Sequence, residues 1–203
     1  MPVTTNVPAV RVLRSDDPEA VRLLAAGAQV QGESWGARLT VTPAVAATCR
    51  AAVAAVRGAG WTVRELVPEE AAALVELDAG AAADYPVTVA TSHDVPDGAV
   101  LAAALEGGDR WAFGAFAADG RLDAATVLYP ASDRIDTDFT VTRSEVRRRG
   151  LATAVKAAAL LALAGAGHVR FGTGGAGANV GSRRANEALG YAVTERWLHL
   201  VAP

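Results

Sequence analysis

The fold is decided by residues 142–152, which read TRSEVRRRGLA and join an expected strand to an expected long helix. At such a junction the first N–H groups of the helix are unpaired and its positive dipole end points outward, which makes an anion site. Gly150 and Ala152 would let a phosphate approach the backbone closely. The arginines at 147–149 add charge-assisted hydrogen bonds at the rim. The stretch predicts a phosphate or pyrophosphate ligand, and the alternative interpretation is a solvated surface turn.

The elements expected around this stretch define an α/β (α+β) chain. Alternating residues before it predict antiparallel strands, with a turn at 119–120. Expected strands cover 111–117, 122–129, 136–142, 168–171 and 191–201, and expected helices cover 151–164 and 182–189. This order indicates a mixed, mostly antiparallel central sheet flanked by helices. Residues 1–58 read as an N-terminal β-α-β-α extension, so the predicted domains are 1–58 and 59–203.

Composition narrows the class of protein. The chain has 203 residues, a formal net charge of −3 and one cysteine, Cys49. A single cysteine excludes an intrachain disulfide and a thiolate metal cluster, so we expect no metal. No apolar run reaches the roughly 18 residues of a membrane span, and the first ten residues lack a signal-peptide pattern. We therefore expect a cytoplasmic protein with no membrane partner, and its acidity argues against nucleic acid.

Two motifs give a family resemblance. Arg147-x-x-Gly150-x-Ala152, between strand and helix, resembles the R/Q-x-x-G-x-G/A motif of the GCN5-related N-acetyltransferases (GNAT). Residues 179–191, NVGSRRANEALGY, are similar to the N-x-x-M-x-x-x-N-x-x-L-G-F segment of that superfamily, at matching spacing. The resemblance covers about residues 61–203. It implies a GNAT-like acyl-CoA N-acyltransferase fold, acetyltransferase activity and acetyl-CoA as co-substrate.

The resemblance also implies which residues hold acetyl-CoA. The backbone from Val146 to Ala152 would bind the pyrophosphate, and an N–H near Val141 or Thr142 would stabilise the oxyanion. Asn179 and Asn186 would lie near the pantetheine arm. The expected cofactor-binding residues are Val141, Thr142, Val146, Arg147, Arg148, Arg149, Gly150, Leu151, Ala152, Thr153, Asn179 and Asn186.

The sequence departs from the family pattern at several positions. Thr142 stands where valine is usual, Ser182 replaces a common methionine, and Gly175 falls where asparagine is frequent. Members that use a tyrosine as general acid carry it at the position of Asn186. A tyrosine acid is therefore absent at that position, and the proton for the departing thiolate must come from water or another group.

A second motif competes for the cofactor assignment. Residues 172–177, GTGGAG, match the G-x-G-x-x-G pattern of dinucleotide-binding folds. The residues that follow are too few for the further strands, crossover helix and ribose-binding acid of a nucleotide-binding half. We interpret the stretch as a flexible loop beside the cofactor.

The expected reaction is direct attack of an amine on the thioester in a ternary complex. Deprotonating a lysine-like amine at pH 7 costs about 4 kcal/mol, which a positioned base can offset. Asp136 and Asp138 share one face of a strand by the period of two, and Glu145 lies in the loop. These three are the catalytic candidates, although exposed carboxylates are commonly only solvated. Tyr129 and His93 are weaker candidates.

The acceptor is expected to be the primary amine of a small molecule. The alternatives are a peptide N-terminus, or a non-catalytic acyl-CoA-binding module with a regulatory role. A homodimer is left open, as are the general base and acid and the role of residues 1–58. Residues 10–35 repeat the order of features in 169–197, which indicates either a degenerate acetyltransferase half or coincidence in an alanine-rich chain.

Overall fold

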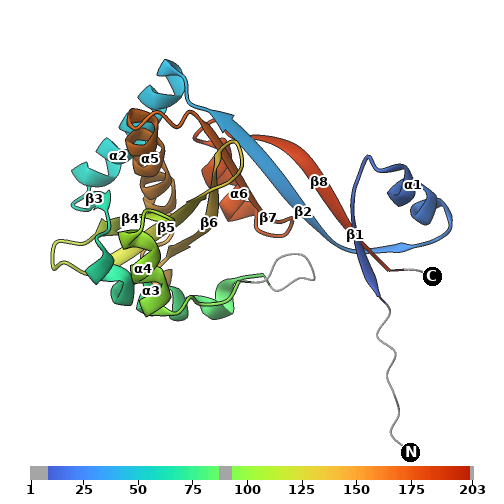
Figure 1. Ribbon diagram of the computed structural model, residues 1–203, viewed down its shortest axis with the longest axis horizontal. Helices are drawn as coiled ribbons and strands as arrows, with labels where there is room; N and C mark the ends of the chain where they lie inside the picture. The colour runs from blue at the N-terminus through green and yellow to red at the C-terminus, as the bar shows by residue number, and fades with distance from the viewer. Residues whose placement is uncertain (1–8, 87–92, 202–203) are drawn as a thin grey trace, which may run out of the picture.

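The computed structural model describes residues 9–86 and 93–201, which form one eight-stranded sheet with helices on both faces (Figure 1). The strand order is β1-β8-β2-β7-β6-β5-β4-β3, and every neighbouring pair is antiparallel except β6 and β7. The strands are β1 (Val10–Arg14), β2 (Gln29–Thr40), β3 (Thr62–Glu65), β4 (Trp111–Phe116), β5 (Leu122–Pro130), β6 (Ile135–Thr142), β7 (Arg170–Ala176) and β8 (Ala192–Val201). The predicted mixed, mostly antiparallel sheet is confirmed.

The helices form two layers. They are α1 (Pro18–Ala25), α2 (Pro43–Gly58), α3 (Ala71–Ala79), α4 (Gly98–Glu106), α5 (Leu151–Gly165) and α6 (Val180–Glu187). One apolar core is built with side chains of α2 and α5, and a second core with side chains of α3 and α4. Figure 1 shows these two pairs on opposite sides of the sheet. Burying apolar side chains on both faces is the main stabilising contribution of this arrangement.

The sheet splits between β6 and β7. These parallel strands pair only at Ile135–Phe171 and Asp136–Gly172 and then separate. On the other edge of β6 the register with β5 shifts next to Asp138, because Val127 pairs with Phe139 and Leu128 pairs with Thr137. A bulge of this kind re-aims side chains and is common beside functional sites. It also interrupts the regular alternation that predicted one shared face for Asp136 and Asp138.

Strand β2 lies inside the sheet, between β7 and β8. The β-α-β-α order expected for residues 1–58 is present, but β2 pairs with strands from the far end of the chain. β2 and β8 run side by side from the body of the molecule into an arm that carries β1 and α1 (Figure 1). The boundary at residue 58 stays a prediction, and strands from both sides of it share one sheet.

The glycine-rich stretch at 172–177 is not a flexible loop. Its first five residues belong to β7, which extends to Ala176, so the pattern also lacks the strand–turn–helix context of a dinucleotide site. A Cβ atom on Gly174 would lie 2.9 Å from the backbone oxygen of Trp35 in β2, and one on Gly175 would lie 3.2 Å from its indole ring. The glycines are therefore needed for the close approach of β7 to β2.

Candidate functional site

The N-terminus of α5 begins with a left-handed residue. Gly150 precedes the helix with φ +81°, a conformation that costs a residue with a Cβ atom about 1–2 kcal/mol. Arg148 is the only described non-glycine residue with a positive φ, at 62°. Ala154 N donates to Gly150 O at 2.9 Å, so the N–H groups of the first turn before Ala154 have no intrahelical acceptor.

No side chain caps this helix, in contrast to several others in the chain. The side chains of Asp17, Thr42, Asp97 and Asn179 accept backbone N–H groups at the starts of α1, α2, α4 and α6, respectively. Gly150 has no side chain with which to do so. The uncapped first turn and the helix dipole together make a site for an anion.

A cavity of about 640 Å³, here called the α5 cavity, lies at this helix start. Its size falls in the range of roughly 300–1,000 Å³ that is usual for small-molecule sites. Its walls come from the end of β6, the first turns of α5 and α6, and the segment after α3. The lining residues are Ala81, Asp84, Tyr85, Thr140, Val141, Thr142, Arg147, Arg148, Gly150, Leu151, Ala152, Thr153, Lys156, Asn179, Gly181, Ser182, Arg184 and Ala185.

The structure brings most of the predicted cofactor-binding residues to this cavity. Those that line it are Val141, Thr142, Arg147, Arg148, Gly150, Leu151, Ala152, Thr153 and Asn179. The other three lie elsewhere. Val146 is buried in the core, and the Arg149 guanidinium lies 5.9 Å from the centre of the Trp61 ring. Asn186 is buried, and its Nδ2 donates to Ser182 O at 2.9 Å.

Arg147 is held in place by partners within the chain. Its Nε donates to Thr142 O at 3.1 Å, and its terminal nitrogen pairs with the Asp84 carboxylate. Arg148 also lines the cavity and has no such partner among the described residues. Arg148 is therefore the arginine of this run that is best placed to contact an anion.

Thr142 supports a ligand in the α5 cavity. Its hydroxyl oxygen is buried and has no hydrogen-bond partner among the described residues. Leaving such a group unpaired costs about 1–3 kcal/mol. Because Thr142 lines the cavity beside the uncapped helix, a polar ligand in that cavity could satisfy the hydroxyl. With the left-handed Gly150, this makes the residues present suitable for the diphosphate and amide groups of coenzyme A.

The carboxylates predicted as catalytic lie outside this cavity. Asp136 accepts from Arg134 at 2.7 and 3.0 Å, and Asp138 is ion-paired with Arg110. Glu145 is exposed in the turn Ser144–Val146, where a backbone hydrogen bond lowers its pKa. Asp136 lines a different cavity of about 370 Å³, called the Tyr129 cavity, together with Tyr129, Thr137 and Gly174. A proton acceptor among these groups would have to give up an arginine contact or act from the exposed loop.

A buried lysine was missed by the sequence analysis. Lys156, on α5, is 5% exposed and lines the α5 cavity. Its Nζ donates to Thr137 Oγ1 at 3.2 Å, and burial lowers its pKa to about 7. The available signal was that Lys156 is the only lysine among 19 basic residues.

His93, a weaker candidate from the sequence, belongs to a group around Asp78 on α3, and the sequence analysis missed Asp78 and Tyr85. This carboxylate is fully buried and accepts hydrogen bonds from Tyr85 Oη at 2.7 Å and His93 Nε2 at 2.6 Å. The His93 ring lies 4.7 Å from the Phe139 ring of β6, and Tyr85 lines the α5 cavity. Burial, followed by the bond to Asp78, raises the pKa of Tyr85. An imidazole held by a carboxylate through Nε2 keeps Nδ1 available, which is the arrangement of a general base.

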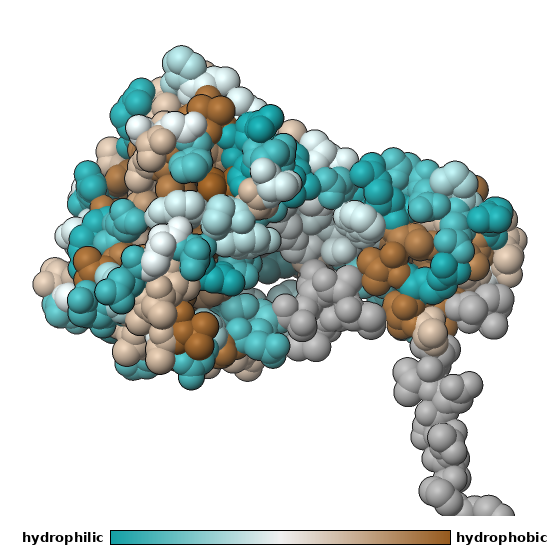
Figure 2. All heavy atoms as spheres, viewed as in Figure 1, coloured by the Kyte–Doolittle hydropathy of each residue, from teal (hydrophilic) through white to brown (hydrophobic). Residues whose placement is uncertain are grey.

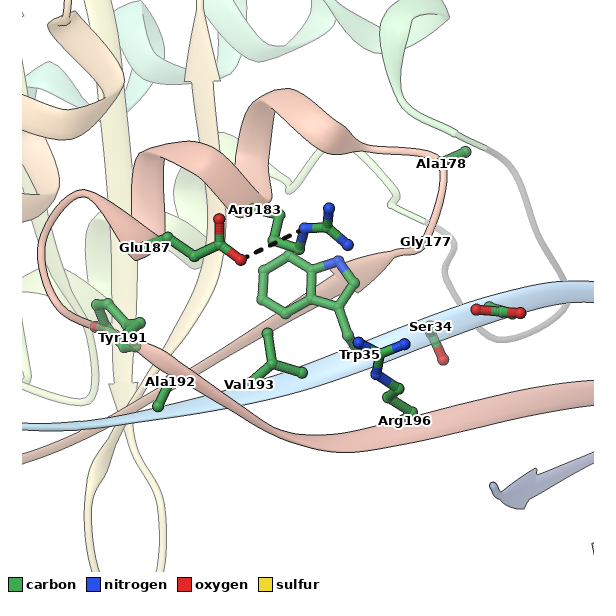
Figure 3. Close-up of a pocket in the computed structure, with 11 residues that line it drawn as sticks. Ser34, Trp35, Gly177, Ala178, Arg183, Glu187, Tyr191, Ala192, Val193 and Arg196 are labelled. Atoms are coloured by element: carbon green, nitrogen blue, oxygen red, sulfur yellow. Dashed lines mark ion pairs between the residues drawn. The ribbon is translucent and has the colours of Figure 1, made fainter. Parts of the chain in front are cut away.

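A further cavity of about 650 Å³, the Trp35 cavity, lies between β2, β8 and α6 (Figure 3). Figure 3 shows the Trp35 indole within it, below an ion pair of 3.5 Å between Arg183 and Glu187. α6 separates the two cavities, since Ser182 and Ala185 line the α5 cavity while Arg183 and Glu187 line this one. The Trp35 cavity mixes both charges and has no helix start in its wall, so it is less suited to a diphosphate.

Comparison with solved structures identifies the fold. A GCN5-related N-acetyltransferase from Sphaerobacter thermophilus matches 95% of this chain and 60% of its own, with 17% identity and a TM-score of 0.66. A GCN5-related N-acetyltransferase from Kribbella flavida matches 97% of this chain and 68% of its own, with 19% identity and a TM-score of 0.58. A tandem GNAT protein from the clavulanic acid biosynthesis pathway matches 96% of this chain and 62% of its own, with 19% identity and a TM-score of 0.56.

The chain therefore has the fold of the GCN5-related N-acetyltransferases, as the two sequence motifs predicted. It spans about 60% of the length of the Sphaerobacter protein. No known family profile matches the sequence, and no curated protein matches it. In the part of the chain that the structure describes, no helix combines the length and apolarity needed to cross a membrane.

Proposed function

We propose that the chain is an N-acetyltransferase that moves the acetyl group of acetyl-CoA to the primary amine of a small molecule. The observation that carries this proposal is the uncapped, left-handed start of α5 at the wall of a 640 Å³ cavity, beside an unpaired Thr142 hydroxyl. The shared GNAT fold supports the same assignment. In this proposal the protein acts in the cytoplasm and binds neither nucleic acid nor a membrane.

The chain's own groups divide the work of binding and chemistry. First-turn N–H groups of α5 and the Arg148 guanidinium bind the diphosphate. The backbone near Val141 and Thr142, where β6 has left β7, is available to the pantetheine amides and to the thioester oxygen. Acetyl-CoA supplies an activated acetyl group. The protein needs to position the amine against it, remove a proton from the amine and protonate the thiolate.

Asp138 is the proposed proton acceptor, with Asp136 and Glu145 as further candidates from the sequence. Asp138 lies at the bulge, two residues beyond the last β6–β7 pair, where the strands have begun to separate. A carboxylate at this position also favours a cationic acceptor. His93 is the rival base, because Asp78 holds its Nε2.

Ligand binding tests the first part of the proposal. Thermal unfolding is measured with acetyl-CoA, CoA and NAD, since a ligand that binds only the folded state stabilises it by about 2.7 kcal/mol at 100 times its dissociation constant. We expect stabilisation by acetyl-CoA and CoA and none by NAD. Stabilisation by NAD alone would contradict the proposal.

Turnover tests the second part. CoA release is measured with panels of small amines and of peptides with free N-termini. We expect release with small amines, whereas release with peptides alone would favour the peptide acetyltransferase alternative. Binding without release from either panel would favour the non-catalytic module.

Two variants identify the base. Asp138→Asn should lower the rate of CoA release at least about 10²-fold while leaving CoA binding unchanged. Asp133→Asn is the matched control, because Asp133 is also an exposed carboxylate paired with an arginine, Arg134. If His93→Gln lowers the rate and Asp138→Asn does not, the base is His93.

A further inference from the structure

We propose that Lys156 is a catalytic residue that donates the proton to the sulfur of the departing coenzyme A thiolate. The inference rests on the proposed function and names the acid of the reaction. It fills the role left open by Asn186, which stands where related enzymes have a tyrosine.

The position of Lys156 is at the point where the sheet opens. Its Nζ bonds to Thr137, the first residue of β6 beyond the last β6–β7 pair at Asp136. Lys156 lines the α5 cavity, whereas Thr137 lines the Tyr129 cavity. The ammonium group therefore lies at the junction of two cavities, one suited to coenzyme A and one available to an acceptor amine. If coenzyme A occupies the α5 cavity and the amine enters from the Tyr129 cavity, the thioester sulfur lies on the side of Lys156.

The residue type also indicates a role in proton transfer. The other 18 of the 19 lysine and arginine residues are arginines, whose guanidinium stays charged in proteins, and the one lysine is buried at the cavity. Among the described residues its only hydrogen-bond partner is Thr137, and no carboxylate pairs with it. A buried amine without a counter-ion destabilises the fold, which is characteristic of a functional group rather than a structural one.

The surrounding titratable groups are less suited to the task. Tyr191, just before β8, meets Thr137 through its hydroxyl, so it shares this partner with Lys156, and Cys49 on α2 and Asp136 on β6 act on Tyr191 electrostatically. Asp136 is paired with Arg134. Burial raises the pKa of Tyr191 and of Cys49, so neither releases a proton readily at neutral pH. Burial lowers the pKa of Lys156 to about 7. This value lies below the roughly 8.5 of a free thiol, so proton transfer from the ammonium to a thiolate is favourable.

The proton balance of the step is complete. The acceptor nitrogen forms the new C–N bond to the acetyl carbon, and the C–S bond breaks with its electron pair left on sulfur. Lys156 gives one proton to that sulfur, which leaves a free thiol and a neutral amine. The attacking nitrogen loses one proton to the proposed acceptor, Asp138, and solvent carries that proton back to Lys156, so no other co-reactant is needed.

The kinetic test varies the leaving group. Lys156→Met should lower kcat with acetyl-CoA about 10²-fold, with KM changed by less than about threefold, because binding is retained. The loss should be at least about tenfold smaller with an acetyl thioester of an acidic aromatic thiol, whose anion leaves without a proton. Lys156→Arg keeps the charge but cannot release a proton, so it should match the methionine variant. Equal losses with both thioesters, or full activity of either variant, would overturn the proposal.

A spectroscopic test does not depend on turnover. As the only lysine, Lys156 gives a single side-chain signal in an NMR spectrum of lysine-labelled protein. CoA should shift the titration of that signal more than a desulfo analogue does, because only CoA places a thiol beside it. If CoA shifts backbone signals but not this one, the role of Lys156 falls and the proposed function stands. If CoA shifts neither the lysine signal nor any backbone signal, both the role of Lys156 and the proposed function are wrong. An acetyl group found on Lys156 after turnover would also overturn the proposal, because the lysine would then be a nucleophile.

Discussion

At position 156 an amine is buried against a single hydroxyl, and the cost of this burial should be measurable. The unfolded chain binds a proton on Lys156 below about pH 10.5, whereas the folded chain does so only below about 7. Between these values the unfolded state binds more protons, so the free energy of unfolding rises with pH by up to about 1.4 kcal/mol per unit. Above pH 10.5 the lysine is neutral in both states and does not lower the free energy of unfolding. As the pH falls from 10.5 to 7, the free energy of unfolding decreases.

Lys156→Met should therefore be more stable than the natural chain at pH 7 while being less active. We expect a gain of at least about 1 kcal/mol in urea unfolding at pH 7, and a smaller gain at pH 9. Opposite effects on stability and activity distinguish a functional group from a packing residue. A variant that is less stable at both pH values would show that the lysine stabilises the core instead.

Gly150 offers a test of the cofactor site at the level of one backbone angle. Gly150→Ala should cost about 1–2 kcal/mol of stability and weaken CoA binding, because alanine resists the left-handed angle that opens the helix start. Gly120→Ala is the matched control. Gly120 has φ +84° and open space around it, but it lies in the turn between β4 and β5. Calorimetric titration with CoA should show weaker binding only for the change at Gly150, and equal affinity for both variants would contradict the site.

Among the elements, β7 and β2 depend on glycine for their spacing. A Cβ atom on Gly174 would meet the Trp35 carbonyl at 2.9 Å, and backbone cannot move aside as a side chain can. Gly174→Ala should therefore destabilise the fold by about 1–3 kcal/mol in thermal unfolding. Gly165→Ala, at the end of α5 with no neighbour within 4 Å, is the control and should be neutral. An unchanged melting temperature for Gly174→Ala would show that the sheet adapts.

The sequence predicted the elements that carry their own local signals. The start of α5 follows from Gly150 and the small residues after it, and the two helices expected within residues 1–58 are α1 and α2. The extent of β7 was missed because its glycines resemble a loop, and only the nearness of Trp35 explains them. Helix α4 was missed because its nearly uniform apolar run, GAVLAAALE, lacks the polar face that marks an amphipathic helix.

Among the site residues, too, those that depend on local sequence could be predicted and those that depend on tertiary contacts could not. Backbone positions near Gly150 could be predicted, because an anion site at a helix start depends on local chain geometry. The ion pairs of Asp136 and Asp138 with Arg134 and Arg110, and the burial of Lys156, depend on tertiary packing. No spacing along the chain contains that information.

At the scale of the whole molecule, the first 58 residues complete the sheet. The units β1-α1-β2 and β7-α6-β8 have the same element order. In the sheet they form the order β1-β8-β2-β7, and swapping β1 with β7 and β2 with β8 gives the same order read from the other end. The residue pairs Ser34–Trp197 and Trp35–Arg196 join the two units where their strands β2 and β8 meet. The arm exposes the apolar side chains Val12 of β1, Val21 and Leu24 of α1, and Val30 of β2. Figure 2 shows hydrophobic surface, in brown, on this arm.

The predicted domain 59–203 should therefore not fold alone. Without β2, the facing edges of β7 and β8 lose their backbone partners, and unpaired edges promote aggregation. We expect the fragment 59–203 to be unfolded or aggregated by circular dichroism and size-exclusion chromatography. Adding the fragment 1–58 during refolding should restore the native spectrum. A stable, monomeric fragment 59–203 would contradict the central role of β2.

The place of β2 also has a consequence for synthesis. Translation produces this strand before both of its neighbours in the sheet, β7 and β8, which lie far downstream in the sequence. The nascent strand cannot pair, and the Trp35 side chain stays exposed, until β7 and β8 have left the ribosome. Contacts of such long sequence separation slow folding and prolong the time in which the chain can misassociate. The sheet therefore closes late in synthesis, and β2 is paired long after it has been made.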